Sequence, residues 1–148
     1  MKKLILLIIV SIVLLLPSCS FKHIEDTNGP DDYSLCSLTD DDFVKGHGSL
    51  SVGSITRTKG KTTTISVNKM SGISNLKTIR PKGKTISITV DLQVESGNVR
   101  IVLMRQKEII YEFKLNTEDT YTISLSDDVY NLRLGGESTK FKLVYTVE

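Results

Sequence analysis

The clearest alternation of apolar and polar positions along the chain lies in the stretch TISITVDLQVE, residues 85–95. One side of this pattern is apolar throughout, and it consists of Ile86, Ile88, Val90, Leu92 and Val94. Successive side chains of a β-strand point to opposite faces, so strict alternation over ten residues predicts a half-buried strand. We expect Ile88 and Val90 to be buried and Thr89 to point away from the core.

Similar but shorter runs follow, separated by turn-forming residues about every ten positions. SGN at 96–98 is expected to turn the chain before the next strand, and GGES at 135–138 is expected to do so before the last. The apolar positions of these runs are Val99, Ile101, Leu103, Tyr111, Phe113, Leu115, Tyr121, Ile123, Leu125, Tyr130, Leu132, Leu134, Phe141, Leu143, Tyr145 and Val147. We expect the four tyrosines among them to pack in the core.

The pattern is weaker upstream of residue 85. Leu50 with Val52 and Ile65 with Val67 indicate two short strands. Residues 68–84, NKMSGISNLKTIRPKGK, are less regular and contain Gly72, so we expect an edge strand or a loop that caps one end of the domain.

Together these runs predict an all-β fold, an antiparallel β-sandwich of about seven to nine short strands formed by residues 43–148. One apolar face per strand suits two sheets that each bury one side. The stretch from GNVRIVLMRQKEIIYEFKL to FKLVYTV resembles the closing strands of jelly-roll-like extracellular domains. Small bacterial lipoproteins and prepeptidase C-terminal-type domains have a similar pattern of strands. The resemblance implies a fold and an extracytoplasmic location, and it carries over no functional residue.

The amino-terminal region has the pattern of a secretory signal. Lys2 and Lys3 precede thirteen residues, Leu4 to Leu16, that are apolar except for Ser11. A helix of that length reaches about 20 Å, which is short of the roughly 30 Å of a bilayer core. It falls within the usual range of about 7 to 15 residues for the apolar part of a signal peptide.

The sequence Leu16-Pro17-Ser18-Cys19 resembles the lipobox of bacterial lipoproteins, with Pro17 as a departure from the small residue usual there. The resemblance implies that residues 1–18 are removed and that Cys19 becomes the lipidated amino terminus. It places the protein on the cell membrane or outer membrane, anchored through Cys19 on the extracytoplasmic face. The alternative is an ordinary signal peptide with a chance cysteine.

The segment that follows differs sharply in charge from the rest. Residues 20–42 contain seven acidic residues and one basic residue, Lys22, so residues 19–42 are expected to form an acidic flexible tether. Without Lys2 and Lys3 the 19 basic residues fall to 17 and equal the 17 acidic ones. The basic isoelectric point therefore belongs to the precursor, and neither it nor the compartment favours nucleic acid as a partner.

Nine basic residues and no acidic ones lie between Phe43 and Val90. One interpretation is that two basic loop tips there contact an anionic surface, with Arg57, Lys59, Lys61, Arg80, Lys82 and Lys84 as the candidate residues. The sequence slightly favours the other interpretation, in which these lysines and arginines serve solubility and are balanced by the acidic residues elsewhere in the chain.

Residues suited to catalysis or cofactor binding are scarce. The only histidine of the expected domain is His47, and no set of nucleophile, base and acid converges around it. Asp40, Asp41 and Asp42 lack the spacing of a calcium loop, so a solvated turn is favoured over a calcium site. Cys36 has no disulfide partner if Cys19 is lipidated.

The sequence thus predicts no enzyme, no cofactor and no metal. The expected function is a non-enzymatic, lipid-anchored surface interaction or structural module, with a cell-envelope polymer or surface protein as its partner. The alternative is an accessory lipoprotein that binds glycan or anionic polymer.

Overall fold

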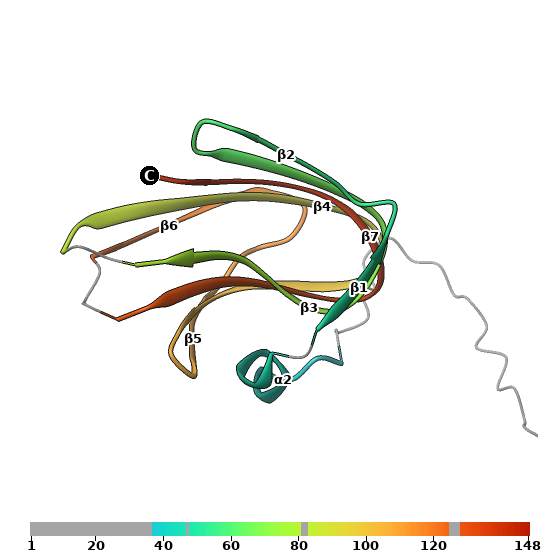
Figure 1. The fold of residues 1–148 in the computed structure, drawn as a ribbon, viewed down its shortest axis with the longest axis horizontal. Coiled ribbons are helices and arrows are strands. Elements are labelled where there is room, and N and C mark those ends of the chain that lie inside the picture. Colours follow the sequence, from blue (N-terminus) through green and yellow to red (C-terminus); the bar gives the residue numbers. More distant parts are fainter. Residues whose placement is uncertain (1–36, 47, 81–82, 125–127) are drawn as a thin grey trace, which may run out of the picture. The chain divides into compact units, whose positions relative to one another are not determined.

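The computed structural model of the chain describes residues 37–46, 48–80, 83–124 and 128–148, all within one compact unit, Tyr33–Glu148. They form one short helix and one antiparallel sheet of seven strands (Figure 1). The elements are α2 (Asp40–Lys45), β1 (Ser49–Val52), β2 (Ile55–Lys59), β3 (Thr62–Ile79), β4 (Thr85–Arg105), β5 (Glu108–Glu112), β6 (Glu118–Ser124) and β7 (Tyr130–Val147). The predicted signal peptide and Cys19 lie outside the described residues.

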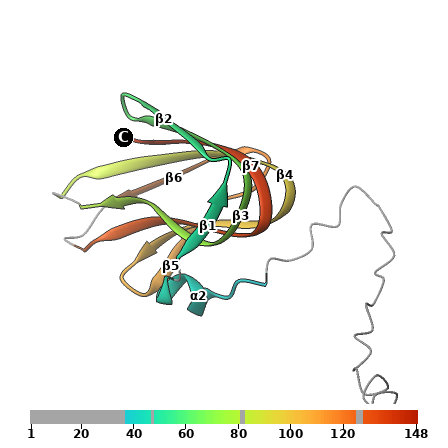
Figure 2. The ribbon, with the colours of Figure 1, turned by 45° about the vertical axis from the view of Figure 1, so that its right-hand side comes forward.

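The sheet is folded over so that its two halves face each other as the layers of a sandwich (Figures 1 and 2). The last strand, β7, lies in the middle and pairs with β3 on one side and β4 on the other. Layer A contains β2, residues 62–67, residues 141–147, residues 85–94 and β6. Layer B contains β1, residues 70–79, residues 130–136, residues 99–105 and β5. The predicted all-β antiparallel sandwich is therefore confirmed.

The three long strands pass from one layer to the other through bulges. The pairing register shifts between Val67 and Gly72 in β3 and between Val94 and Asn98 in β4. Gly97 has a φ of +74°, and an added Cβ there would lie 2.7 Å from backbone atoms of β7. A bulge bends a strand without ending its ladder, and glycine adopts the conformation that this close approach requires.

The turns expected at 96–98 and 135–138 are accordingly wrong, because β4 and β7 continue through both segments. These strands have 21 and 18 residues, far longer than the short strands predicted. The expectation of an edge strand or a loop for residues 68–84 is correct in part. Residues 68–79 belong to β3, and residues 73–79 pair with β7 only, whereas residues 69–72 also pair with β1. The bulges account for the irregular spacing of their apolar positions.

The main core lies between the two layers and contains the residues that the alternation predicted. Ile88 and Val90 are fully buried, whereas Thr89 is only half-buried and bonds across the outer face to Thr120. Of the four tyrosines, Tyr130 and Tyr145 are buried, and the other two pack partly buried against the same core.

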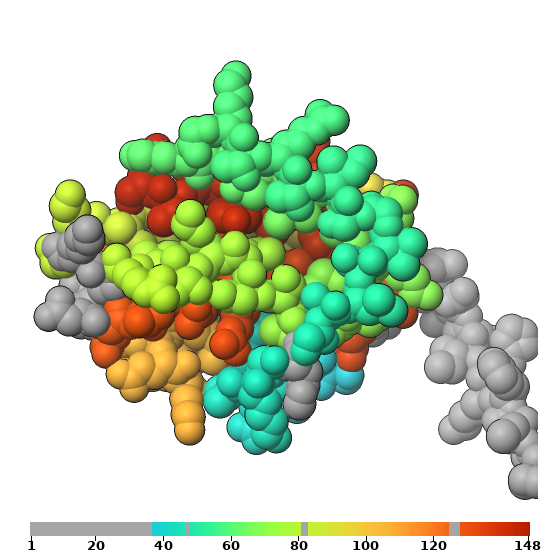
Figure 3. All heavy atoms as spheres, viewed as in Figure 1, coloured from blue at the N-terminus to red at the C-terminus, as the bar shows by residue number. Residues whose placement is uncertain are grey.

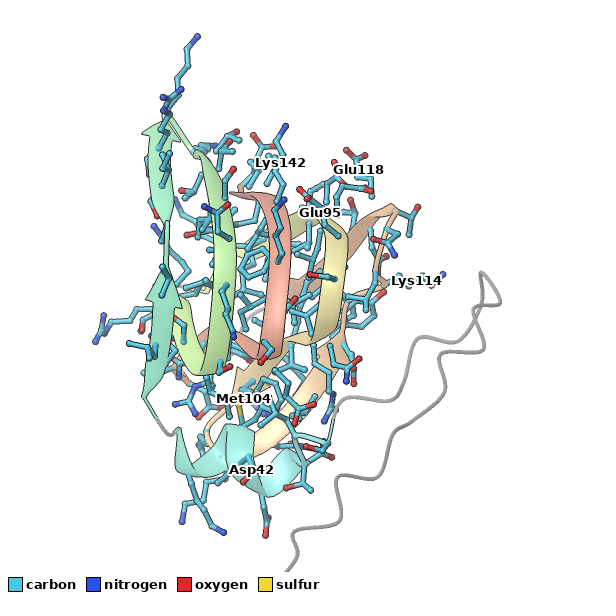
Figure 4. All side chains as sticks on the ribbon, turned by 90° about the vertical axis from the view of Figure 1, so that its right-hand side faces the viewer. Asp42, Glu95, Met104, Lys114, Glu118 and Lys142 are labelled. Carbon is cyan, nitrogen blue, oxygen red and sulfur yellow. The ribbon has the colours of Figure 1, made fainter. Side chains whose placement is uncertain are left out.

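A second, smaller cluster lies where α2 packs on layer B. Phe43 is fully buried with Ile73, Val102 and Met104, and Figure 4 shows Met104 next to the helix. Arg100 donates to the Leu38 carbonyl at 2.8 Å. The described residues 37–42, which fall in the predicted tether, thus contact the domain. The sequence favoured a solvated turn over a calcium site for these aspartates, and it did not predict the helix.

Candidate anionic-surface site

The strands β1 and β2 form one margin of the folded sheet, which we call the β1–β2 margin (residues 49–59). Both pair only with β3, so their other edge has no neighbouring strand among the residues that the structure describes. Figure 3 shows this margin as a continuous band of teal and green atoms. Unpaired edges are where sheets most readily meet other molecules.

The polarity of this margin is the reverse of that of an ordinary sandwich strand. Leu50, Val52 and Ile55 point outward and are 76%, 61% and 58% exposed. The positions between them carry hydroxyls on exposed residues, and these line an open groove of about 110 Å³ that also includes Met70 and Phe141. The inward hydroxyl residues are Ser49, Ser51, Ser54 and Thr56.

Next to the margin, the outer face of layer A holds a hollow of about 330 Å³, lined by Ile55, Arg57, Thr64, Ser66 and Lys142. Strand register brings these residues together, because Ile55 is opposite Ser66, Arg57 is opposite Thr64, and Ser66 is opposite Lys142. Within the described part of the chain, neither Arg57 nor Lys142 is recorded with an acidic partner. The hollow therefore presents two cations and two hydroxyls, a set that suits an oxyanion.

A row of threonines crosses the same outer face beside the hollow. Thr62 is opposite Thr146, which is opposite Thr89, which is opposite Thr120. The hydroxyls of Thr62 and Thr146 lie 2.9 Å apart, and those of Thr89 and Thr120 lie 3.0 Å apart. Each hydroxyl keeps further capacity to donate or accept, so this face offers many weak polar contacts around the two cations.

The structure brings together part of the predicted basic set. Arg57 and Lys59 lie on β2, and Lys61 follows in the hairpin to β3; all three are exposed. Arg80 and Lys84 flank the connection from β3 to β4, where Lys82 lies outside the described residues. Both loops lie at the end of the sandwich away from the bends (Figure 1).

Lys142 is the residue that sequence reasoning missed. It lies on β7, far along the chain from the basic stretch, and only the pairing of β7 with β3 brings it to Ser66 and the hollow. Figure 4 shows its side chain on the outer face of the sheet. Its position on the polar side of the alternating stretch FKLVYTV was the available signal, but nothing in the sequence identified the neighbouring strand.

The shifted ionisable groups all lie on the β4–β6 side. Hydrogen bonds from Arg100 to Glu112 raise the pKa of the arginine, with Asp40 adding to this despite burial. Burial opposes ionisation of Asp119, but the Lys114 N–H and the Tyr111 hydroxyl more than offset it and lower the pKa of the carboxyl. The same hydrogen bond raises the pKa of Tyr111. These groups hold strands and helix together, and the basic hollow is separate from them.

Two of the three aspartates considered from the sequence have structural partners. Asp40 pairs with Arg100 at 2.9 Å, and Asp42 accepts from the Thr39 backbone N–H and hydroxyl at the start of α2. No three His, Cys, Asp or Glu side chains within the described ranges gather closely enough to hold a metal ion. His47 and Cys36 lie outside those ranges.

The described part of the chain contains no helix with the length and apolar character needed to cross a membrane. No protein-family model matches the chain, and no curated protein sequence matches it either.

Proposed function

We propose that this protein is a lipid-anchored, extracytoplasmic interaction module without enzymatic activity, and that the β1–β2 margin contacts an anionic surface of the cell envelope. The observation that carries the proposal is the hollow, in which Arg57 and Lys142 flank two hydroxyls without an acidic partner among the described residues. Its occupant would be a negatively charged group.

The surrounding charge supports this proposal. No acidic residue occurs on β1, β2 or β3, and the first one after them is Asp91 on β4. Cations on one side of a domain create a field that draws it towards an anionic surface. Near a charged membrane each well-placed lysine or arginine contributes about 1 kcal/mol.

The proposed anchor is compatible with this contact. Cys19 precedes Ser37, the first described residue, by 18 positions. A chain of that length spans at most about 60 Å when fully extended. Lipidation at Cys19 would therefore keep the domain near the membrane surface and raise its effective concentration there.

A soluble anionic polymer is the second candidate partner, and the threonine row favours it. A polymer with repeated carboxylates or phosphates would place one group between Arg57 and Lys142. Hydroxyl groups of the polymer would form hydrogen bonds with the threonine row of Thr62, Thr146 and Thr89.

The anchor is tested with Cys19→Ser in the full chain. This variant should remain unprocessed or be released, and it should leave the detergent phase that retains the native protein. Unchanged mass and unchanged partitioning would contradict the anchor.

The surface contact is tested with residues 20–148, which lack the signal and the lipid. We expect Arg57→Gln/Lys142→Gln to lower binding to phosphatidylglycerol vesicles or to heparin at least tenfold at low salt. The control Lys107→Gln/Lys114→Gln changes net charge equally but acts on the β4–β6 side. Binding should weaken with added salt, because exposed charges are screened beyond about 8 Å at physiological ionic strength. Equal losses in the two variants would contradict a localised site.

A further inference from the structure

We infer that the surface contacted by the β1–β2 margin is the anionic lipid bilayer itself, and that Leu50, Val52 and Ile55 enter the boundary between headgroups and acyl chains. We call these three residues the apolar ridge. The inference rests on the proposed function and names its partner.

The apolar ridge is built into the fold. Leu50 is opposite Ser71 and Ser51 is opposite Met70, which directs Leu50 and Val52 outward. A slip of one residue would exchange the two faces and direct Leu50 and Val52 into the groove. The contact between Gly72 and the Gly48 backbone fixes the register, because a Cβ at Gly72 would lie 2.4 Å from the Gly48 oxygen.

Exposed apolar side chains are common singly, but here three occupy successive outward positions of adjoining edge strands. A contiguous apolar patch on a surface marks a contact with a protein or a membrane. Covering the groove with these side chains would have been the alternative use of the same residues. Their outward placement therefore calls for an apolar environment outside the domain.

Cations accompany the ridge. Lys69 is paired opposite Val52, and Arg57 follows Ile55 at the next outward position, beside Lys142 in the hollow. Apolar residues flanked by lysine and arginine are the composition of surfaces that lie in the interface of an anionic membrane. A headgroup phosphate supplies the oxyanion for the hollow, and the acyl boundary accepts the ridge.

The other occupants fit less well. A hydrated polymer would use the cations and hydroxyls but would leave the ridge in water. A second copy paired edge to edge would bring the basic side chains of two identical margins towards each other, and like charges repel. The bilayer is the one partner that matches both the ridge and the cations.

The test compares three forms of residues 20–148: the native sequence, a ridge variant (Leu50→Gln/Val52→Thr) that leaves the hollow's own lining residue Ile55 in place, and the cation variant Arg57→Gln/Lys142→Gln. Binding is measured by cosedimentation with phosphatidylglycerol–phosphatidylcholine vesicles and with pure phosphatidylcholine vesicles, and by titration with heparin. We expect the ridge variant to lose at least tenfold in binding to the anionic vesicles and to keep its binding to heparin. The cation variant should lose both.

Two results overturn the inference and leave the proposed function standing. The first is a ridge variant that binds the anionic vesicles like the native sequence while the cation variant does not. The second is a ridge variant that changes only the self-association of the free chain. If neither variant changes binding to vesicles or to heparin, the proposed function itself fails. Matching unfolding curves for all three forms show that the losses are not caused by misfolding.

Insertion depth gives an independent readout, because the chain contains no tryptophan. A single tryptophan at Leu50→Trp should be quenched by brominated acyl chains when anionic vesicles are added. The control is Glu118→Trp, at an exposed position of β6 on the opposite margin of the sheet. Its tryptophan fluorescence should not be quenched. Quenching absent from Leu50→Trp, or equal in both variants, would overturn the inference.

Discussion

The two margins of the folded sheet occupy equivalent places but have opposite construction. Each consists of two short strands, β1 and β2 on one side and β5 and β6 on the other, placed beside the long bent strands. The β5–β6 margin (residues 108–124) closes its side of the sandwich with aromatic rings. Tyr111 stacks on Tyr121 with ring centroids 4.1 Å apart, and Phe113 is 2% exposed.

The β1–β2 margin directs serine and threonine inward and leaves Leu50 and Val52 in solvent. Its side of the sandwich consequently keeps an open groove of about 110 Å³. One margin uses its apolar area to stabilise the domain, whereas the other keeps that area available to a partner. Both margins form strands, but only the β5–β6 margin buries its apolar side chains. The structural side of the domain therefore differs from the side proposed to interact in burial and not in strand formation.

The largest expected effect on stability is at the β5–β6 margin. Phe113→Ala should lower the free energy of unfolding by about 3–5 kcal/mol, because it removes a buried ring and leaves a cavity. Leu50→Ala, on the β1–β2 margin, should change the free energy of unfolding by less than about 0.5 kcal/mol. Urea denaturation followed by circular dichroism measures both values, and similar losses at the two positions would refute the difference between the margins.

An intermediate effect is expected from the carboxylate that joins β5 to β6. Asp119→Asn should lower the free energy of unfolding by about 1 kcal/mol near neutral pH, because the ionised group accepts from Tyr111 and from the Lys114 N–H.

The pH dependence of this effect has a defined sign. The folded-state pKa of Asp119 lies below its ordinary value, so the stabilisation is present above about pH 4 and is lost as the pH falls through the folded pKa. The difference between the native protein and Asp119→Asn should therefore shrink in acid. A difference that stays constant from pH 7 to pH 2 would argue against this origin. Tyr111→Phe serves as the matched control that removes one donor only.

A smaller effect on stability, of opposite sign, is expected at the β1–β2 margin. Ser51→Val places a larger apolar side chain beside Met70 in the groove and should raise the free energy of unfolding by about 0.5–1 kcal/mol. Thermal unfolding of both proteins in one buffer is the appropriate measurement. A destabilised variant would show that the serine has a structural role that its size does not explain.

The smallest effect concerns the cations of the hollow. Arg57→Gln/Lys142→Gln should change the free energy of unfolding by less than about 0.5 kcal/mol, because neither side chain has an acidic partner among the described residues. Glu112→Gln weakens the ion pair with Arg100 at the β5–β6 margin and should lower the free energy of unfolding by more than that. The order of these two variants in the same denaturation series checks the contrast between a contact surface and a structural ion pair.

The fold class was predictable because alternation records which residues share a face. It worked for Ile88, Thr89 and Val90, where the strand is regular. It failed at Gly97 and in residues 68–79, because a bulge adds a residue on one strand and interrupts the period of two while the pairing continues. Local turn residues therefore marked bends instead of chain reversals.

The candidate site was only partly predictable for a related reason. Arg57 belonged to a basic stretch visible in the sequence, but its association with Lys142 depends on long-range pairing through β3. Alternation at Leu50 and Val52 indicated a strand without showing which of its faces the rest of the domain covers. The burial of Phe43 was hidden by the acidic residues before it, whose charges suggested a solvated chain.

The central position of β7 has a consequence for how the domain is made. Its residues pair with positions as distant in the sequence as Thr62, opposite Thr146, and Ile88, opposite Val147. A nascent chain that has emerged only as far as β6 holds two separate hairpin units with no strand to join them. Loop closure over such distances slows folding, and unpaired strand edges are prone to aggregate meanwhile. Completion of the sheet must therefore wait for the last strand, and until then the edges of β3 and β4 that β7 will cover stay unpaired.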